Sequence, residues 1–351
     1  MKAFYCLAAA ALSVAMSATA HADTFRLRMG GGHTTGLTYV KVYDTFFADE
    51  VSKRVAERTD HKVRFIKAWG GSVAKVDGAI EAVQNGTLDI GLSPIGFEQS
   101  RAGLLNYSAY IPFTTPDPTV QAAVSNRMIK EVPALQESMK RYNSYVLGAM
   151  VSEAYGTATT FDWNTVEGLK GKRIALAGTN APLFMAVDAV PVTLGIGEHY
   201  QAMQTGLADG SLFYMSGMEA FKLKEVAKYF NKSGFGSLST LVAFMSLSTR
   251  EKLPKEVVAI IDEVALEAAV KVGELSKQRD QDVEAKLKSE GITINTLPLE
   301  ERRKWAEAVK DLPIRAAKEL DGKGFPATEV FKTYIRFLKE AGYTFPVDYQ
   351  L

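Results

Sequence analysis

The chain has 351 residues, of which 47% are apolar and 23% are charged, a composition that is typical of a globular protein and excludes a disordered adaptor. Its 41 basic and 40 acidic residues give a formal net charge of +1. Because the charges balance, nothing attracts the chain to nucleic acid or to an anionic membrane surface, and we expect neither as a partner.

The first 22 residues are typical of a cleavable secretory signal. An apolar run over residues 7–16 lies between Lys2 and the small-residue site Ala20-His21-Ala22, and it is too short for a comfortable membrane span. We therefore expect an exported, soluble protein that begins near Asp23, with no stable membrane insertion. Cys6, the only cysteine, is removed with the signal, so the mature chain has no disulfide and no cysteine metal site.

Two distant segments share one pattern. Residues 82–89 and 202–209 both read Ala, apolar, Gln, any, Gly, any, apolar, Asp. In each, Gly86 or Gly206 is placed to end a helix in the left-handed conformation before a strand begins. Chance similarity is one explanation, since this succession is common in α/β proteins. The simpler explanation is two α/β lobes on one plan, with a ligand cleft between them.

Alternating strand and helix patterns run along most of the chain, and they predict mainly parallel sheets. Strands are expected at 25–29, 63–66, 88–92, 145–151, 173–177, 191–192, 212–215 and 241–247, and helices at 39–57, 76–84, 183–189 and in the run that ends near Gln204. We assign 23–148 to a first lobe, completed by about 240–275, and 149–239 to a second lobe, completed by about 276–351.

Helical spacing of apolar residues continues without interruption from Pro254 to Gly291. A single helix of this length is about 50 Å long at 1.5 Å per residue, enough to brace both lobes. The alternative is two helices with a break in the polar run 276–282.

Sequence signals for an enzyme, a metal site or a cofactor are missing. His33, His61 and His199 have no metal-ligand spacing, and the last two are interpreted as structural or exposed. The glycine run Gly30-Gly31-Gly32 does not continue as a dinucleotide-binding loop, and no serine-nucleophile motif is present. We therefore predict a binding protein with no catalytic residue, no metal and no cofactor.

Several short motifs together resemble the extracytoplasmic solute-binding proteins of TRAP transporters, the DctP type. They are Leu169-Lys170-Gly171-Lys172-Arg173-Ile174, Val190-Pro191-Val192, Glu198, Tyr200, Gln201-Ala202, Gln204, Gly206, Asp209-Gly210, Gly70-Gly71-Ser72, the stretch from Val83 to Asp89, and Leu253-Pro254. The resemblance implies a periplasmic, two-lobed clamshell that a long helix braces. It also implies that the clamshell closes on a small, usually carboxylate-bearing solute and delivers it to a permease of one small and one large membrane subunit.

The chain departs from this family at the residue that grips a ligand carboxylate. In the family the strand after Leu-Lys-Gly carries an Arg, and here Ala175 stands at that position. No basic residue lies between Met150 and Asp162, and Phe213 and Tyr214 replace the usual Asn. A small dicarboxylate is thus a poor candidate, and we expect a more apolar, aromatic or lipophilic ligand.

The expected ligand-binding residues lie at predicted strand ends that face the cleft. They are His33, Trp69, Ser93, Glu98, Tyr155, Ala175, Phe213, Tyr214 and Met215. Three alternatives remain open: a carboxylate ligand held by Arg173, His33 or a bound cation; a module that reports ligand to a membrane receptor; and a secreted enzyme that uses Glu98 or Glu153.

Overall fold

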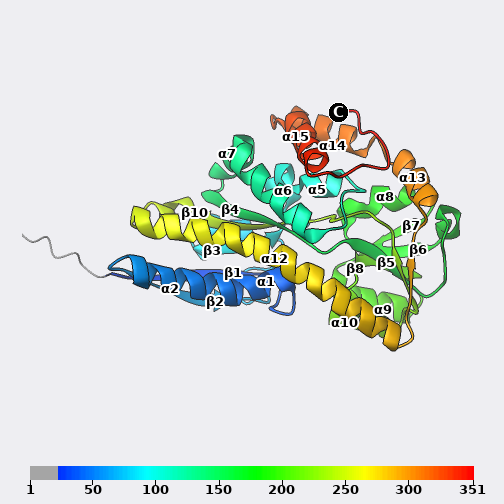
Figure 1. Cartoon of the computed structure of the whole chain (residues 1–351), viewed down its shortest axis with the longest axis horizontal. Coiled ribbons are helices and arrows are strands. Elements are labelled where there is room, and N and C mark those ends of the chain that lie inside the picture. The colour runs from blue at the N-terminus through cyan, green and yellow to red at the C-terminus, as the bar shows by residue number, and fades with distance from the viewer. Residues whose placement is uncertain (1–22) are drawn as a thin grey trace, which may run out of the picture.

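The computed structural model describes residues 23–351 and contains two separate β-sheets (Figure 1). One has five strands in the order β2-β1-β3-β10-β4, and the other has six in the order β11-β9-β5-β8-β6-β7. We call the parts of the chain built on them lobe I and lobe II. The predicted signal, residues 1–22, lies outside the described residues.

Lobe I begins with the expected parallel unit, in which β1 pairs with both β2 and β3. Its strands are β1 (Thr24–Gly31), β2 (Lys62–Ala68), β3 (Ile90–Pro94), β4 (Ser144–Val151) and β10 (Thr240–Ser246). Its helices are α1 (Thr38–Val42), α2 (Ala48–Arg58), α3 (Ala79–Gln84), α4 (Gln99–Ala102), α5 (Tyr107–Tyr110), α6 (Pro118–Glu131), α7 (Pro133–Lys140) and α11 (Leu247–Arg250). A π-helical turn, Tyr43–Phe47, joins α1 to α2, so the helix predicted over 39–57 is continuous.

Lobe II follows β4 directly, and β10 returns the chain to lobe I. The strands of lobe II are β5 (Tyr155–Thr159), β6 (Arg173–Leu176), β7 (Val190–Thr193), β8 (Gly210–Tyr214), β9 (Tyr229–Lys232) and β11 (Thr293–Thr296). Its helices are α8 (Ala181–Met185), α9 (His199–Gln204), α10 (Gly217–Ala220) and α13 (Leu299–Ala308). The strands predicted at 145–151 and 241–247 correspond to β4 and β10, which pair antiparallel in lobe I.

The repeated sequence pattern has the same backbone conformation in both lobes. Gly86 and Gly206 have φ angles of 78° and 73°, in the left-handed region that glycine adopts without strain. Two residues later, Leu88 N–H donates to the Ala82 carbonyl at 2.9 Å and Ala208 N–H donates to the Ala202 carbonyl at 3.0 Å. The pattern therefore encodes one turn, used once in each lobe, that ends α3 or α9 and leads into a strand.

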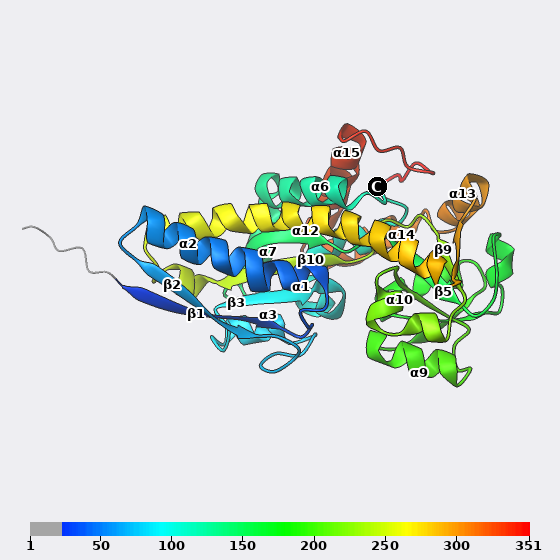
Figure 2. The same cartoon turned by 60° about the horizontal axis from the view of Figure 1, so that its bottom comes forward.

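A single 35-residue helix, α12 (Lys255–Ser289), crosses from lobe I to lobe II (Figure 2). Its first part buries residues from Val257 to Val272 in the lobe I core, and its last part buries Val283 and Leu287 against lobe II. The predicted long helix is therefore unbroken, and the alternative of two helices separated at 276–282 is wrong.

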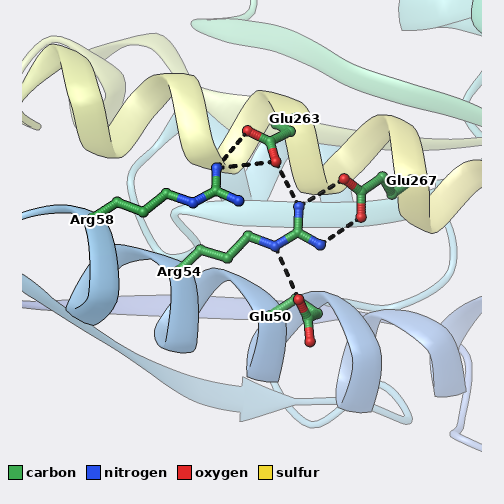
Figure 3. Close-up of polar contacts among 5 residues, drawn as sticks. All are labelled: Glu50, Arg54, Arg58, Glu263 and Glu267. Carbon is green, nitrogen blue, oxygen red and sulfur yellow. Dashed lines mark hydrogen bonds and ion pairs between the residues drawn. The ribbon is translucent and has the colours of Figure 1, made fainter.

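An ion-pair network joins α12 to α2 on the surface of lobe I (Figure 3). The Arg54 guanidinium donates to Glu50 at 2.9 Å and to both Glu263 and Glu267 at 2.7 Å. Arg58, one turn later on α2, donates to Glu263 at 2.9 Å. Arg54, which bonds carboxylates on both helices, is therefore the centre of the network that fastens the lobe I part of α12 to α2.

The C-terminal helices α14 (Leu312–Gly322) and α15 (Ala327–Glu340) require a correction, because we expected residues 276–351 to complete lobe II. Both helices lie beside α5 and α6 of lobe I (Figure 1). The Tyr334 ring lies 4.7 Å from the Tyr107 ring, and its hydroxyl donates to Gln121 Oε1 at 2.7 Å. The apolar face of α15 packs against lobe I, so of this segment the end of α12, β11 and α13 belong to lobe II.

Candidate functional site

A cavity of about 40 Å³, which we call the inner chamber, lies between the lobes, as the clamshell predicts. Both lobes supply its walls. The lining residues are His33, Tyr39, Pro94, Phe97, Ser239 and Leu241 from the lobe I side, and Ser152, Tyr155, Ala177, Asn180, Leu194, Ile196, His199, Leu212, Phe213 and Tyr214 from the crossing and lobe II. None of these described lining residues is a Lys, Arg, Asp or Glu.

A wider cavity of about 590 Å³, the mouth, shares His33, Phe97 and Ile196 with the inner chamber. Its charged lining residues are Arg279 of α12 and Glu219 of α10. Arg279 Nη1 donates to the Gly36 carbonyl of lobe I at 3.2 Å. Charge is therefore present at the rim of the cleft, whereas the inner chamber carries only neutral polar groups.

Aromatic side chains form the lobe II wall of the inner chamber. Tyr155 of β5 faces Tyr214 of β8 in the antiparallel register, with ring centroids 5.7 Å apart. Phe213 lies edge-on to Tyr155 at 5.9 Å. Burial raises the pKa of Tyr155 and Tyr214, so both hydroxyls keep their protons at neutral pH and serve as uncharged hydrogen-bonding groups.

His33 follows β1 and lines both the chamber and the mouth. Its Nδ1 lies 2.8 Å from the Tyr39 hydroxyl, and burial lowers its pKa to about 4, so the ring is neutral at pH 7. The preceding glycines allow this placement through close packing. A Cβ on Gly30 would lie 2.3 Å from the Ala68 carbonyl oxygen, and one on Gly32 would lie 2.2 Å from the Val76 nitrogen.

His199, which the sequence indicated only as a structural or exposed histidine, is buried and also lines the chamber. It opens α9, and its Nδ1 lies 2.7 Å from the Ser211 hydroxyl. Ser211 is paired in the sheet with Ala175. Burial lowers the pKa of His199, which favours a second neutral imidazole in the wall of the chamber.

Four of the nine predicted contacts line the inner chamber, namely His33, Tyr155, Phe213 and Tyr214. Met215 instead lines a separate cavity of about 340 Å³ at the crossing between the lobes, which we call the hinge cavity. It shares Tyr155 with the chamber. The hinge cavity is also lined by Asp117, Lys232, Lys277, Asp280 and Glu284.

The remaining predicted contacts have structural partners and line none of these three cavities. Trp69 Nε1 donates to Asp44 Oδ1 at 2.7 Å, which turns the indole toward α1 and α2. The Glu98 carboxylate accepts from the backbone N–H of Ala79 at 3.2 Å and from that of Ile80 at 3.1 Å, and so caps the short α3.

Ser93 and Ala175 are also corrections. Ser93 is fully buried, and its hydroxyl donates weakly to the Pro94 carbonyl at 3.4 Å. Ala175 is fully buried in a cluster with Ala202 and Met203 of α9. Their positions on the strands predicted that these side chains face the cleft. In the structure each side chain instead points into the protein interior.

The alternative cation Arg173 does not line the chamber. Its guanidinium donates to Asp209 Oδ1 at 2.7 Å, and its side chain is largely exposed. Glu153, one candidate for an acid or base, is buried in the crossing from β4 to β5, where Thr38 Oγ1 approaches it at 3.5 Å. Burial raises its pKa. Among residues 23–351, no three His, Cys, Asp or Glu side chains are placed to hold a metal ion.

Two lobes that enclose a small, mostly apolar chamber, braced by one long helix, define a solute-binding protein. The family model described as bacterial extracellular solute-binding protein, family 7 (DctP), matches residues 41–319. The chain therefore belongs to this family, whose members are binding proteins rather than enzymes. No helix within residues 23–351 is long and apolar enough to cross a membrane.

Comparison with individual proteins agrees with this family. The C4-dicarboxylate-binding periplasmic protein DctP of Rhodobacter capsulatus is 27% identical over 145 residues, 41% of this chain and 43% of that protein, so this alignment spans less than half of that relative. A TRAP periplasmic solute-binding protein of Desulfovibrio salexigens, crystallised in an open complex, has a TM-score of 0.80 at 16% identity over 90% of this chain and 96% of its own.

A TRAP solute-binding protein of Rhodoferax ferrireducens T118, crystallised with copurified benzoate, has a TM-score of 0.79. It is 16% identical, over 90% of this chain and 98% of its own. At these identities the two structures show that the fold is shared, and the ligand of each belongs to that protein.

Proposed function

We propose that this protein captures a small, largely apolar or aromatic organic solute in the cleft formed by the inner chamber and the mouth, and delivers it, in the periplasm, to a TRAP-type permease of one small and one large subunit. The observation that carries the proposal is the lining of the chamber, where Tyr155, Phe213 and Tyr214 face His33 across the lobes and no charged side chain is present. The export signal predicted over residues 1–22 supports the periplasmic location.

Apolar contact is the main source of affinity in such a chamber. Each methylene that a ligand buries contributes about 0.8 kcal/mol, and an aromatic ring gains further from edge-on neighbours. Conversely, an unpaired carboxylate that loses its water without gaining a cation is strongly disfavoured. The benzoate that copurified with the Rhodoferax ferrireducens protein supports a ring-sized solute for this fold, although that solute is an acid.

A carboxylate ligand is the second candidate, and Arg279 at the mouth favours it. This guanidinium lines the cavity that opens into the chamber, and it bonds only a backbone carbonyl there. The C4-dicarboxylate named for the Rhodobacter capsulatus relative supports an acid as well. Such a ligand would reach outward from the chamber and place its carboxylate at the rim.

Thermal unfolding of the mature protein, stripped of copurified solute, tests the proposal against short dicarboxylates, aromatic acids and their neutral analogues. A ligand at about a hundred times its Kd adds roughly 2.7 kcal/mol, which is a shift of several degrees. Aromatic compounds are expected to raise the midpoint while short dicarboxylates leave it unchanged. Arg279→Gln is the matched control, because loss of binding in this variant would favour the carboxylate candidate.

Delivery to the permease needs its own measurement. Uptake of the identified solute into vesicles that hold both membrane subunits is expected to require this protein. Uptake that proceeds equally well in its absence would contradict the transport role and leave ligand sensing as the alternative.

A further inference from the structure

Each lobe presents one histidine to the inner chamber, and each ring is held in the same way. His33 Nδ1 pairs with the Tyr39 hydroxyl at 2.8 Å in lobe I. His199 Nδ1 pairs with the Ser211 hydroxyl at 2.7 Å in lobe II. We call these two side chains the imidazole pair. A hydroxyl on Nδ1 fixes each ring without adding charge, so both rings are oriented, neutral parts of the walls.

The hydrogen-bond partners define what His199 can offer. Its Nε2 lies 3.4 Å from the Leu194 carbonyl, which can only accept, so Nε2 carries the proton and Nδ1 accepts from Ser211. That contact is long, so the N–H has capacity for a second, closer acceptor. His33 Nε2 has no hydrogen-bond partner among residues 23–351, so this atom is the open polar position on the opposite wall.

The charged and titratable groups around the pair do not favour an imidazolium ion. Tyr39 and Tyr155 keep their protons. The Leu194 carbonyl and Glu198 both favour the charged form of His199, but burial outweighs them and lowers its pKa. Arg279 and Glu219 stand at the mouth and carry opposite charges. Burial lowers the pKa of both histidines, to about 4 for His33. Burial therefore favours the neutral form of both rings near neutral pH.

We propose that the imidazole pair selects an uncharged polar group on an apolar or aromatic body: a primary amide, an alcohol or an un-ionised acid. The inference rests on the proposed function, since it concerns the ligand of the same chamber. A neutral imidazole offers a hydrogen-bond donor or acceptor but no positive charge. It can therefore pair with a buried amide or hydroxyl, whereas a buried carboxylate would lack a counter-charge.

Titration calorimetry with three matched probes tests this selection at pH 7.5. Benzamide, benzoate and toluene share one ring and differ in the group attached to it. Benzamide is expected to bind at least tenfold more tightly than benzoate. Its affinity should stay level between pH 5.5 and 8, whereas benzoate should weaken about tenfold for each unit above the pKa of the acid, because only the un-ionised form binds.

Substitutions of the two histidines test whether they cause the preference for benzamide. His199→Phe and His33→Phe should each weaken benzamide about three- to tenfold, the effect of one neutral hydrogen bond, and leave toluene within twofold. Toluene binding also shows that the chamber is intact. His199→Gln, which keeps a donor, should recover most of the loss. Equal losses for benzamide and toluene in the phenylalanine variants would overturn the selecting role.

The outcomes separate this inference from the proposed function. Tighter binding of benzoate than of benzamide at pH 7.5 would overturn the selection of an uncharged group, while an aromatic solute would stand. Failure of all three probes to bind would contradict the aromatic ligand and the selection together.

Discussion

The carboxylate of Asp209 holds Arg173 at two points, accepting from its backbone N–H at 2.9 Å and from its guanidinium at 2.7 Å. Asp89 holds Arg28 similarly in lobe I, with its backbone N–H at 2.8 Å and Nε at 3.2 Å. The two aspartates are the last residues of the repeated pattern. Each therefore fastens the turn after a helix to the neighbouring parallel strand, which explains why the pattern ends in Asp.

Asp209→Asn should lower the unfolding free energy by about 1 kcal/mol, because the Arg173 N–H loses an ionised acceptor. Ligand affinity should not change, since neither residue lines the chamber. Urea unfolding and calorimetry on the same samples measure both effects. Asp89→Asn is the matched control in lobe I and should give a similar loss. A large fall in affinity for Asp209→Asn would instead assign Arg173 to the ligand.

Local periodicity accounts for what the sequence predicted well. The long helix over residues 254–291 and the glycine turns of the repeat depend on contacts within a few residues, which the sequence displays directly. The destination of α15 could not be predicted in this way. Its apolar face specifies burial, but only tertiary packing against Tyr107 and Gln121 decides that lobe I provides the partner.

The site was predicted unevenly for a related reason. Phe213 and Tyr214 were found because a strand end in an α/β lobe faces the cleft. Glu98 was placed there wrongly because its partner, the start of α3, is about twenty residues away and the pairing has no sequence signature. His199 was missed because an isolated histidine has no pattern. One signal was available: His199 begins α9, and this helix packs against the strand that carries Ala175.

The network of α2 and α12 predicts unequal effects for its two arginines. Arg54 bonds three carboxylates and is 15% exposed, whereas Arg58 bonds one and is 49% exposed (Figure 3). Arg54→Ala should cost about 1–2 kcal/mol and Arg58→Ala less than about 0.5 kcal/mol, because exposed single pairs contribute little. Urea unfolding at low and high salt measures both. Equal losses would show that the shared cation is not the centre of the network.

Because of Asp280 on α12, we expect the unfolding free energy to fall as pH rises. Burial, together with the nearby carboxylates Glu153 and Glu284, raises its pKa to about 8 against the opposing effect of Lys232 and Arg279. The folded protein therefore binds more protons than the unfolded chain between about pH 4 and pH 8. Within that window the unfolding free energy should decrease with pH, by at most about 1.4 kcal/mol per unit for this group.

Asp280→Asn should remove this contribution and leave the protein more stable than the parent near pH 8. Thermal unfolding in steps from pH 5 to pH 9 provides the comparison. Asp117→Asn, whose carboxylate is paired with Lys277 at 2.7 Å in the same hinge cavity, is the matched control and should not stabilise the protein. A parallel pH profile for parent and Asp280→Asn would show that this carboxyl is ionised throughout.

Phe213→Ala and Trp69→Ala distinguish the chamber from the supporting core. Phe213 lines the chamber edge-on to Tyr155, so its loss should weaken the tightest aromatic ligand by about 1–2 kcal/mol, roughly five- to thirtyfold. Trp69 bonds Asp44 instead, so its loss should lower stability by about 1–3 kcal/mol and leave affinity within twofold. Calorimetry and thermal unfolding separate the two. If Trp69→Ala weakened the ligand as much as Phe213→Ala, the chamber would extend to the end of β2, and the bond to Asp44 would have to open when the solute binds.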